Sequence, residues 1–427
     1  MSYALFSCRT SPVTGIYNAR EIDARIPREV LDLLCVEKMA AEAAIAATAG
    51  EVITCNAAVA YEAGAPMIVD KICVAPPKPS EVRLKITHTS LCRTDLTFWR
   101  AIGQKKVFPR IFGHEAAGIV ESVGKEVTGV KPGDHVVPLF TGECQECRYC
   151  RSGKTNLCQK FKVDTDRGVL ASDGTSRFST KDGKPIYHFL GTSTFSEYTV
   201  VDQACVAKID KAAPLDKVCL LSCGITTGLG ASINTAKVEK GSTVAIFGLG
   251  TIGFAAAQGA KIAGASRIIG IDVLPEKLAL GKKFGLTDTV NPKEHDKPIQ
   301  EVIKEMTDGG VDYAIECVGN VKLIEAAVES VHEGWGKAVV AGLDDNTKFV
   351  SVHPGNFLYG RLLTGTFFGD YKGRSQMNDL VEMYMKKELN LDDFITHNLP
   401  FHKVNEAFQL LIEGKCLRCV LHMEHDH

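Results

Sequence analysis

The stretch Thr243-Val-Ala-Ile-Phe-Gly-Leu-Gly-Thr-Ile-Gly253 decides the fold of this chain. Residues 243–247 form a compact β-branched and apolar run that predicts a buried strand, and residues 251–263 predict a helix. The glycine fingerprint GxGxxG joins the two and comprises Gly248, Leu249, Gly250, Thr251, Ile252 and Gly253. Its first glycine permits a tight turn, its second lets a pyrophosphate approach the backbone, and its third allows close helix–strand packing. The helix N-terminus then faces the phosphate charge.

A second predicted strand, residues 267–272, ends in Asp272, 19 residues beyond Gly253. A carboxylate at this place accepts hydrogen bonds from the adenosine ribose hydroxyls and repels a 2′-phosphate. Glycines also close ordinary turns, and a doubly wound fold without a cofactor is the plain alternative. Because strand, glycine loop, helix and acid stand in the required order, we predict a dinucleotide site that binds NAD rather than NADP.

Strands alternate with helices through the region that follows. Further strands are predicted at residues 312–317 and 337–342, with a helix at 321–331 between them. This alternation is typical of a parallel sheet covered by helices on both faces. We therefore assign residues 225–367 to a doubly wound Rossmann dinucleotide-binding domain, and the chain to the α/β class.

The preceding region has short strands without regular intervening helices. They are predicted at residues 52–61, 67–74, 81–89, 118–123 and 134–139, and residues 164–187 are predicted to form one long loop. This pattern predicts a β-rich, barrel-like or sandwich-like catalytic domain, to which we assign residues 47–224 and 368–427. Residues 1–46 form an N-terminal extension of unknown role. Their mixture of arginine and acidic residues does not favour an organelle transit peptide.

The composition is that of an ordinary soluble enzyme. Hydrophobic residues make up 45% and charged residues 23%, and the formal net charge is −2. This balance gives no case for a nucleic-acid or membrane-surface partner, and no apolar run reaches the roughly 20 residues of a membrane span. Fifteen cysteines in a long chain without a secretory signal indicate a reducing compartment, so we expect a cytoplasmic location.

Four of the cysteines form one cluster with the spacing C-x2-C-x2-C-x7-C. They are Cys144, Cys147, Cys150 and Cys158. Four thiolates on a tight lobe can surround a zinc ion tetrahedrally and leave no open position, which is the structural type of zinc site. An iron–sulfur cluster also uses four cysteines, but nothing else in the chain suggests electron transfer.

A second, dispersed set has weaker spacing. Cys92 begins the run Cys-Arg-Thr-Asp, His114 lies in Gly-His-Glu-Ala-Ala-Gly, and Cys223 lies in Ser-Cys-Gly. Taken alone, a buried cysteine behaves as a small apolar residue, and a lone histidine is usually a hydrogen-bonded core residue. Their sequence surroundings are what single them out.

These surroundings make the family recognisable. The chain resembles the zinc-containing medium-chain alcohol dehydrogenases, and within them the plant alcohol dehydrogenase-like group, from about Ala47 to Leu421. The resemblance is carried by the four-cysteine lobe and by residues 112–124 (FGHEAAGIVESVG), 191–201 (GTSTFSEYTVV), 247–253 (FGLGTIG) and 306–316 (MTDGGVDYAIE). It implies a GroES-like catalytic domain, a homodimer, and reversible NAD-linked oxidation of a primary or secondary alcohol.

The resemblance also implies roles for individual residues. Cys92, His114 and Cys223 would bind a catalytic zinc whose fourth position stays open, so that the subunit holds two zinc ions in all. Zinc acts as a Lewis acid on a bound alcohol, and hydride then passes to the nicotinamide. Glu115 would lie beside that zinc, and Thr94 would hydrogen-bond to the substrate alcohol. Coenzyme contacts are expected at Arg93, Asp272, Lys277, Val318, Ala341, Gly342, Leu343, Phe368 and Arg418.

The chain departs from several relatives in its proton relay. Those relatives end the relay at a histidine five residues after the first zinc cysteine, and this chain has Thr97 there. A threonine can pass a proton but is no base near pH 7. The outlet of the relay therefore stays open.

Three other functions are weighed against the main prediction. A glutathione-dependent formaldehyde dehydrogenase of this family carries an arginine where this chain has Lys162, and one residue fewer between Cys92 and His114. An NADP-dependent cinnamyl-alcohol type enzyme is disfavoured by Asp272. A catalytically inactive binding protein is disfavoured because every ligand position is intact. Phe98, Trp99 and Phe140 suggest an aromatic-lined substrate pocket, but the physiological alcohol is not predicted.

Overall fold

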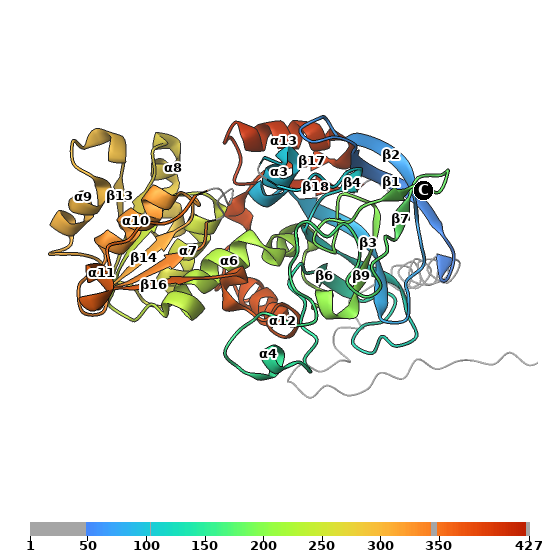
Figure 1. The fold of residues 1–427 in the computed structure, drawn as a ribbon, viewed down its shortest axis with the longest axis horizontal. Coiled ribbons are helices and arrows are strands. Elements are labelled where there is room, and N and C mark those ends of the chain that lie inside the picture. The colour runs from blue at the N-terminus through green and yellow to red at the C-terminus, as the bar shows by residue number, and fades with distance from the viewer. Residues whose placement is uncertain (1–47, 103, 343–347, 424–427) are drawn as a thin grey trace, which may run out of the picture. The chain divides into compact units, whose positions relative to one another are not determined.

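The computed structural model describes residues 48–102, 104–342 and 348–423, all within one compact unit, Thr48–His427. The predicted N-terminal extension, residues 1–46, lies outside the described residues. The described elements build three sheets, one parallel and two mostly antiparallel (Figure 1).

The parallel sheet forms around the strand that precedes the glycine loop. Its strands are β11 (Thr243–Phe247), β12 (Arg267–Ile271), β13 (Asp288–Val290), β14 (Tyr313–Glu316), β15 (Lys337–Val340) and β16 (Leu362–Gly365). They lie in the order β13-β12-β11-β14-β15-β16, and every adjacent pair is parallel. The predicted doubly wound sheet is confirmed.

Alternate residues of β11 are buried against different helices. The helices are α7 (Thr251–Ile262), α8 (Pro275–Leu280), α9 (Ile299–Met306) and α10 (Val321–Ser330). Ile246 belongs to one buried cluster with Phe254 of α7, whereas Phe247 belongs to another with Val302 of α9 and Val328 of α10. Successive strand residues point to opposite faces, so helices cover both faces of the sheet. Helix α8 is short, and a 3₁₀ turn, Gly281–Phe284, follows it directly.

The β-rich region contains the other two sheets. One has the order β4-β1-β2-β7-β8, and the other runs β10-β6-β5-β3-β18-β17 with β9 also paired to β3. The strands are β1 (Ile53–Ala60), β2 (Ile68–Val74), β3 (Glu81–Ser90), β4 (Arg110–Ile111), β5 (Glu115–Val123), β6 (His135–Pro138), β7 (Phe178–Ser179), β8 (Pro185–Ile186), β9 (Tyr198–Asp202), β10 (Val206–Lys208), β17 (Ile395–Pro400) and β18 (Arg418–His422). The predicted loop 164–187 therefore contains two short strands, β7 and β8.

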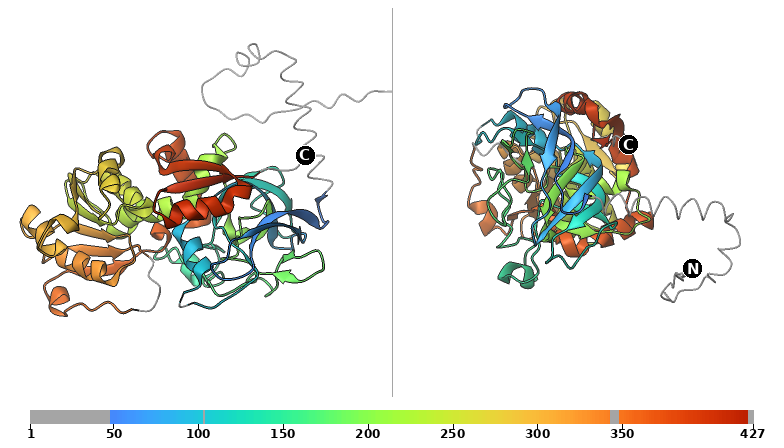
Figure 2. Two further views of the ribbon diagram at one scale, coloured as in Figure 1. Left: turned by 90° about the horizontal axis from the view of Figure 1, so that it is seen from above. Right: turned by 90° about the vertical axis from the view of Figure 1, so that its right-hand side faces the viewer.

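Helices at the edges of this region position the site residues. They are α3 (Arg93–Arg100), α4 (Arg148–Arg151), α6 (Gly224–Gly230), α12 (Gly373–Met385) and α13 (Val404–Ile412). Strand β18 lies next to β3, so the C-terminal segment completes the sheet that the N-terminal strands begin. Figure 2 shows this segment in red beside the blue strands.

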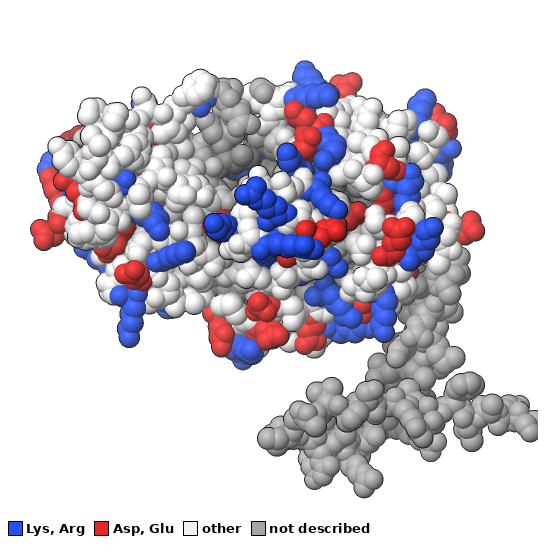
Figure 3. Space-filling view, turned by 60° about the horizontal axis from the view of Figure 1, so that its bottom comes forward, with Lys and Arg blue, Asp and Glu red and all other residues white. Residues whose placement is uncertain are grey.

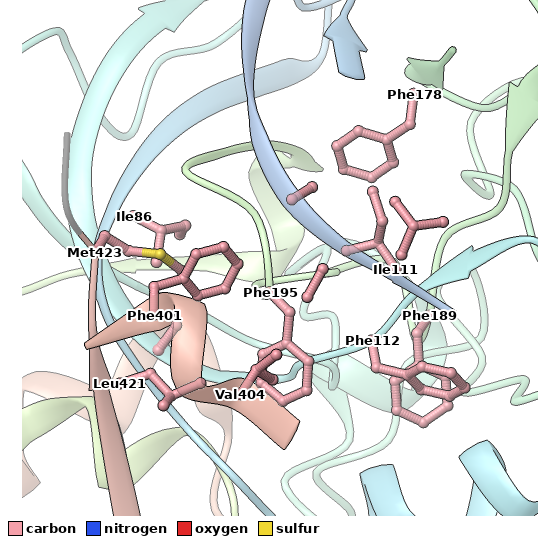
Figure 4. Close-up of a cluster of buried hydrophobic side chains, with 14 of the residues drawn as sticks. Ile86, Ile111, Phe112, Phe178, Phe189, Phe195, Phe401, Val404, Leu421 and Met423 are labelled. Carbon is pink, nitrogen blue, oxygen red and sulfur yellow. The ribbon is translucent and has the colours of Figure 1, made fainter. Parts of the chain in front are cut away.

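The core of the β-rich region is aromatic. Figure 4 shows Phe112 and Phe189 side by side, with Phe195, Phe401 and Leu421 nearby. All five are at most 4% exposed. Phe98 packs against Phe189, and Trp99 packs against Phe408 while donating its indole N–H to the Ala65 carbonyl. Both side chains therefore pack in the core, and their place beside a substrate pocket stays a prediction.

The length of the described helices and the charge on one face of the surface are the features that bear on a membrane-spanning or strongly charged protein. Among the described residues no single helix is long and apolar enough to cross a bilayer, although the bent pair Leu215–Ser222 and Gly224–Ala236 passes that test jointly. On the face in Figure 3, basic and acidic side chains are interspersed.

Candidate active site

Three potential metal ligands from distant parts of the chain meet at one point. Cys92 precedes α3, His114 precedes β5, and Cys223 precedes α6. Together with a carboxylate oxygen of Glu115, their ligand atoms all lie within 4.8 Å of one another, and all four residues are buried. The Sγ atoms of Cys92 and Cys223 are 4.0 Å apart. A tetrahedral zinc with Zn–S bonds of about 2.3 Å holds two sulfurs about 3.8 Å apart, so the spacing fits zinc.

The orientation of His114 provides a second test of the fit. Its Nδ1 lies 3.0 Å from Asp95 Oδ1, and its Nε2 is buried without a hydrogen-bond partner among the described residues. A carboxylate that holds one ring nitrogen leaves the other free to ligate a metal. Asp95 also accepts hydrogen bonds from the backbone N–H groups of Cys92 and Gly113. One carboxylate therefore fixes two of the three ligand positions.

The thiols have strongly altered acidity. The hydrogen bond from Cys223 lowers the pKa of Cys92 well below its ordinary value against the effect of burial, and Arg418 and His114 lower it further. The same interaction, together with burial, raises the pKa of Cys223. A low pKa favours the thiolate, which is the form that binds a metal.

Glu115 and Arg418 form a buried ion pair beside these ligands. Arg418 donates from Nε and Nη2 to the two carboxylate oxygens at 2.7 Å each, and its Nη2 also lies 3.7 Å from Cys92 Sγ. Burial raises the pKa of Glu115, and the guanidinium counteracts that rise. Arg418 Nη1 donates to Thr251 Oγ1 in the first turn of α7. Arg418 thus connects the metal-ligand cluster to the glycine loop.

The geometry of the glycine loop matches its fingerprint. Gly248 has φ +93°, a left-handed conformation that a glycine adopts without strain. A Cβ on Gly253 would lie 1.9 Å from the Gly248 carbonyl oxygen, whereas a Cβ on Gly250 would point into open space. The carboxylate of Asp272 accepts hydrogen bonds from the N–H groups of Leu249 and Leu274. It therefore lies beside the glycine loop at the end of β12.

Two cavities connect this loop with the metal-ligand cluster. The larger, of about 400 Å³, is lined by Gly248, Asp272 and Lys277, and the smaller, of about 130 Å³, by Cys92, Thr94 and Thr97. They share the lining residues Arg93, Gly250, Thr251, Cys317, Val318 and Arg418. An elongated ligand lying along the glycine loop would therefore end at the metal ligands.

Four further residues are expected to contact the coenzyme: Ala341, Gly342, Leu343 and Phe368. The N–H groups of Ala341 and Gly342 both donate to the Glu316 carbonyl, and a Cβ on Gly342 would lie 2.0 Å from Gly319 N. Phe368 is 2% exposed and packs against Phe140. Leu343 lies outside the described residues.

The four-cysteine lobe is also confirmed as a cluster. Cys144, Cys147, Cys150 and Cys158 bring their sulfurs within 4.8 Å of one another, and the Cys144–Cys150 and Cys147–Cys158 pairs are 3.8 and 3.9 Å apart. The Cys150 backbone N–H is the main cause that lowers the pKa of Cys147 to about 6. The lobe is fastened to a distant segment, because Asn156 donates to the Phe367 and Tyr371 carbonyls and Lys372 donates to the Cys150 carbonyl.

Two contacts around the metal-ligand cluster were not predicted from the sequence. The Cys-Arg-Thr-Asp run predicts no role for Asp95 at the metal site, although a carboxylate three residues after Cys92 is the expected partner of the Cys92 backbone N–H at the start of a helix. Gly224 packs against Arg418, and a Cβ there would lie 2.2 Å from Nη2. No local pattern in the sequence signals that contact.

A doubly wound dinucleotide fold and a Cys-His-Cys cluster define the class as a zinc-binding dehydrogenase. Family models agree: residues 78–211 match the alcohol dehydrogenase GroES-like domain, and residues 251–386 match the zinc-binding dehydrogenase family. The chain belongs to the zinc-containing medium-chain alcohol dehydrogenase family.

Within that family, the chain is similar to plant enzymes. It is 61% identical to alcohol dehydrogenase 1 of Petunia hybrida over 379 residues, which cover 88% of this chain and 99% of that protein. It is 60% identical to alcohol dehydrogenase 1 of Zea mays, covering 88% of this chain and all of that protein. Among solved structures, benzyl alcohol dehydrogenase from Acinetobacter calcoaceticus is 29% identical with a TM-score of 0.80, over 87% of this chain and 100% of that one.

Proposed function

We propose that this chain is a zinc-dependent, NAD-linked alcohol dehydrogenase that oxidises primary or secondary alcohols to aldehydes or ketones, reversibly. One observation carries the proposal: the Cys92, His114 and Cys223 cluster borders a cavity that shares its wall with the cavity along the glycine loop. The similarity to plant alcohol dehydrogenases supports the same activity.

In this proposal, zinc bound by Cys92, His114 and Cys223 supplies a Lewis acid that lowers the pKa of an alcohol hydroxyl. Thr94 lines the same cavity next to Cys92, so its hydroxyl can accept a hydrogen bond from the alcohol and donate its own proton onward as the alcohol proton transfers to it. Thr97 lines that cavity as well, but its hydroxyl donates to the Arg93 carbonyl. Since a threonine is no base near pH 7, Thr97 is not the final acceptor of the proton.

Coenzyme binding is assigned to residues that line the larger cavity, namely Arg93, Asp272, Lys277, Val318 and Arg418, and to Ala341, Gly342 and Phe368 outside its lining. Asp272 and Lys277 would contact the adenosine ribose, and Arg93 and Arg418 the pyrophosphate. Val318, Ala341, Gly342 and Phe368 would border the nicotinamide. Gly250 leaves open space for the pyrophosphate, since no atom lies within 4 Å of the place where a Cβ would stand. Asp272 disfavours NADP through like-charge repulsion.

We further propose two zinc ions per subunit, the second held by the four-cysteine lobe in a closed structural site. Atomic emission on purified protein tests the count. Wild-type enzyme is expected to give two zinc ions per chain, and Cys147→Ser and Cys92→Ser one each. A single zinc in the wild type would contradict the assignment.

The activity is tested by NADH production with ethanol, a longer primary alcohol and a secondary alcohol. Wild-type protein should reduce NAD, and Cys92→Ser should lose turnover while still binding NADH. Protein that contains both zinc ions and forms no NADH with any alcohol would overturn the proposal. Turnover that requires hydroxymethylglutathione would support the glutathione-dependent alternative instead.

We also propose a homodimer that joins the parallel sheets of two subunits at β16. Among the described strands β16 pairs with β15 alone, and apolar side chains beside it are exposed: Phe349 by 94%, Leu358 by 84% and Tyr359 by 66%. Exposed apolar patches of this kind mark association sites. Analytical ultracentrifugation should give twice the chain mass, and Leu358→Asp should weaken the dimer.

The domain boundaries and location are proposed from the same reasoning. Residues 47–224 and 368–427 would form the catalytic domain and residues 225–367 the coenzyme domain. The thirteen cysteines among the described residues form no disulfide with one another, which fits a reducing compartment such as the cytoplasm. Cell fractionation tests the location.

A further inference from the structure

Arg110 is a buried cation that the proposed mechanism does not use. It is 2% exposed, and its guanidinium forms no ion pair with any carboxylate among the described residues. Burial lowers the pKa of Arg110 to about 10, and Asp164 and Asp166 oppose that effect. At neutral pH the side chain therefore remains charged. A buried charge without a partner is costly, so its hydrogen bonds must hold it in place.

Those hydrogen bonds all go to backbone carbonyls of one long loop. Nε donates to the His188 carbonyl at 2.8 Å, and Nη2 donates to the carbonyls of Thr165 at 2.9 Å and Arg167 at 3.4 Å. A hydrogen bond within the loop joins the same two ends, because the His188 N–H donates to the Gly168 carbonyl. One guanidinium thus ties the start of the loop, near residue 165, to its end, near residue 188.

The same guanidinium lies over two rings of the aromatic core. Its Cζ is 5.2 Å from the Phe189 ring centre and 5.8 Å from that of Phe112, two rings that lie side by side in Figure 4. Phe189 in turn contacts the ring of the metal ligand His114, at 5.9 Å between ring centres. A cation over aromatic faces adds attraction beyond simple packing. Arg110 therefore lies one ring away from the proposed zinc site.

The loop segment that Arg110 holds also forms a cavity wall. Phe161, Val163 and Arg167, whose carbonyl Arg110 holds, line a small cavity of about 20 Å³ together with Phe140, and Phe140 contacts the ring of the metal ligand His114. Phe161 and Val163 also line a neighbouring cavity of about 380 Å³, whose wall Phe367 packs against Phe140. Apolar space separated from a metal ligand by Phe140 is where the carbon chain of an alcohol would lie.

We propose that Arg110 is a positioning residue: it fixes segment 161–168 as a wall of the alcohol pocket and so determines how sharply the enzyme discriminates alcohols by size. This inference rests on the proposed function. Arg110 touches neither alcohol nor coenzyme. It acts through the carbonyls of Thr165 and Arg167, and a wall held at these points cannot yield to fit a substrate of the wrong shape.

Arg177 offers a matched control on the same loop. It is 3% exposed, but it pairs with Glu81 and Asp173, and the hydrogen bonds of its side chain go to residues 81 and 173–176 rather than to segment 161–168. Arg110→Lys and Arg177→Lys make the same substitution at two buried sites. Lysine keeps the charge but loses the planar fork that reaches several carbonyls at once.

The test compares wild type, Arg110→Lys and Arg177→Lys in two measurements. The first is the ratio of kcat/KM for hexanol to kcat/KM for ethanol. In Arg110→Lys we expect this ratio to change by about tenfold and to come closer to one. The KM for NAD and the zinc content should stay unchanged. In Arg177→Lys the ratio should stay within about twofold of wild type. The second is amide hydrogen exchange over residues 161–168, expected to be about tenfold faster in Arg110→Lys alone.

The outcomes separate the two proposals. If Arg110→Lys keeps the wild-type ratio and exchange rate, or if Arg177→Lys changes both equally, the positioning role is wrong. If wild type oxidises no alcohol, the proposed function fails, while the exchange measurement still reports whether Arg110 holds the segment. Where Arg110→Lys does not fold, Arg110→Gln removes the buried charge, keeps a donor for one carbonyl, and is judged by the same two measurements.

Discussion

The guanidinium of Arg418 donates hydrogen bonds to both carboxylate oxygens of Glu115, although the residues are 303 positions apart in the chain. Glu115 opens strand β5 next to the ligand His114, and Arg418 opens strand β18 and also binds Thr251 of the glycine loop. The pair therefore holds the metal-ligand cluster and the glycine loop in a fixed position relative to each other.

Removing the cation of this pair should be strongly destabilising. Arg418→Met leaves the Glu115 carboxylate buried without a partner, and we expect the free energy of unfolding to fall by about 3–5 kcal/mol. Lys322→Met, which breaks the exposed Lys322–Glu325 pair, should cost less than about 1 kcal/mol. Urea unfolding of both variants checks this, and equal losses would show that the buried pair has no special role.

Asp95→Asn should weaken zinc binding at the Cys-His-Cys cluster alone. Asp95 holds His114 Nδ1 and the Cys92 backbone N–H, so an amide there disturbs two ligands. We expect the affinity for one of two zinc ions to fall by about 10- to 100-fold, measured by competition with a chromogenic chelator. The zinc of the four-cysteine lobe should be retained. Loss of both ions together would point to general unfolding instead.

Asp272→Ser should relax the preference for NAD. The carboxylate lies at the end of β12, where a 2′-phosphate would meet like charge, and a hydroxyl removes that repulsion. We expect the ratio of kcat/KM for NAD to that for NADP to fall by about a hundredfold. Steady-state kinetics with both coenzymes measures it. An unchanged ratio would mean that another residue selects the coenzyme.

His188 should make the fold sensitive to acid. Burial, with smaller contributions from Arg177 and Arg110, lowers the pKa of His188 to about 3, whereas an unfolded histidine titrates near 6.5. Between these values the unfolded chain binds more protons than the folded chain. The stabilisation by neutral His188 is therefore full above about pH 6.5 and is lost as the pH falls towards 3, by up to about 1.4 kcal/mol per pH unit.

His188→Gln removes this titration but keeps an acceptor for the Arg177 N–H. Its free energy of unfolding should depend less steeply on pH between 6.5 and 5 than that of wild type, measured by urea unfolding at several pH values. The exposed control His295→Gln should follow wild type. Any acid loss of zinc affects all three proteins alike, so parallel curves for wild type and His188→Gln would contradict the assignment.

The sequence was most informative where function depends on local spacing. The sequence predicted the strand, turn and helix of the coenzyme domain from the run Thr243 to Gly253 and from Asp272. This was possible because each glycine of the run is required there for a local steric reason. The four lobe cysteines lie within 15 consecutive residues, so their spacing alone predicted a shared site.

Contacts between distant segments could not be read in this way. Cys92, His114 and Cys223 needed the family resemblance to be grouped, since nothing local brings residues 131 positions apart together. Trp99 was expected in a pocket because it is aromatic, and nothing local showed that its ring packs on Phe408 of a helix that begins some 300 residues later. The role of Asp95 depends on the return of Gly113 and His114 to its side, which is a property of the fold.

The attachment of the four-cysteine lobe has a consequence for a distant segment. Asn156 and Lys372 connect the lobe to residues 367–372, where the chain leaves the parallel sheet after β16 and enters α12. The four-cysteine lobe is therefore hydrogen-bonded to the segment by which the chain passes from the parallel sheet to α12, so a change in the shape of the lobe would reach that segment directly.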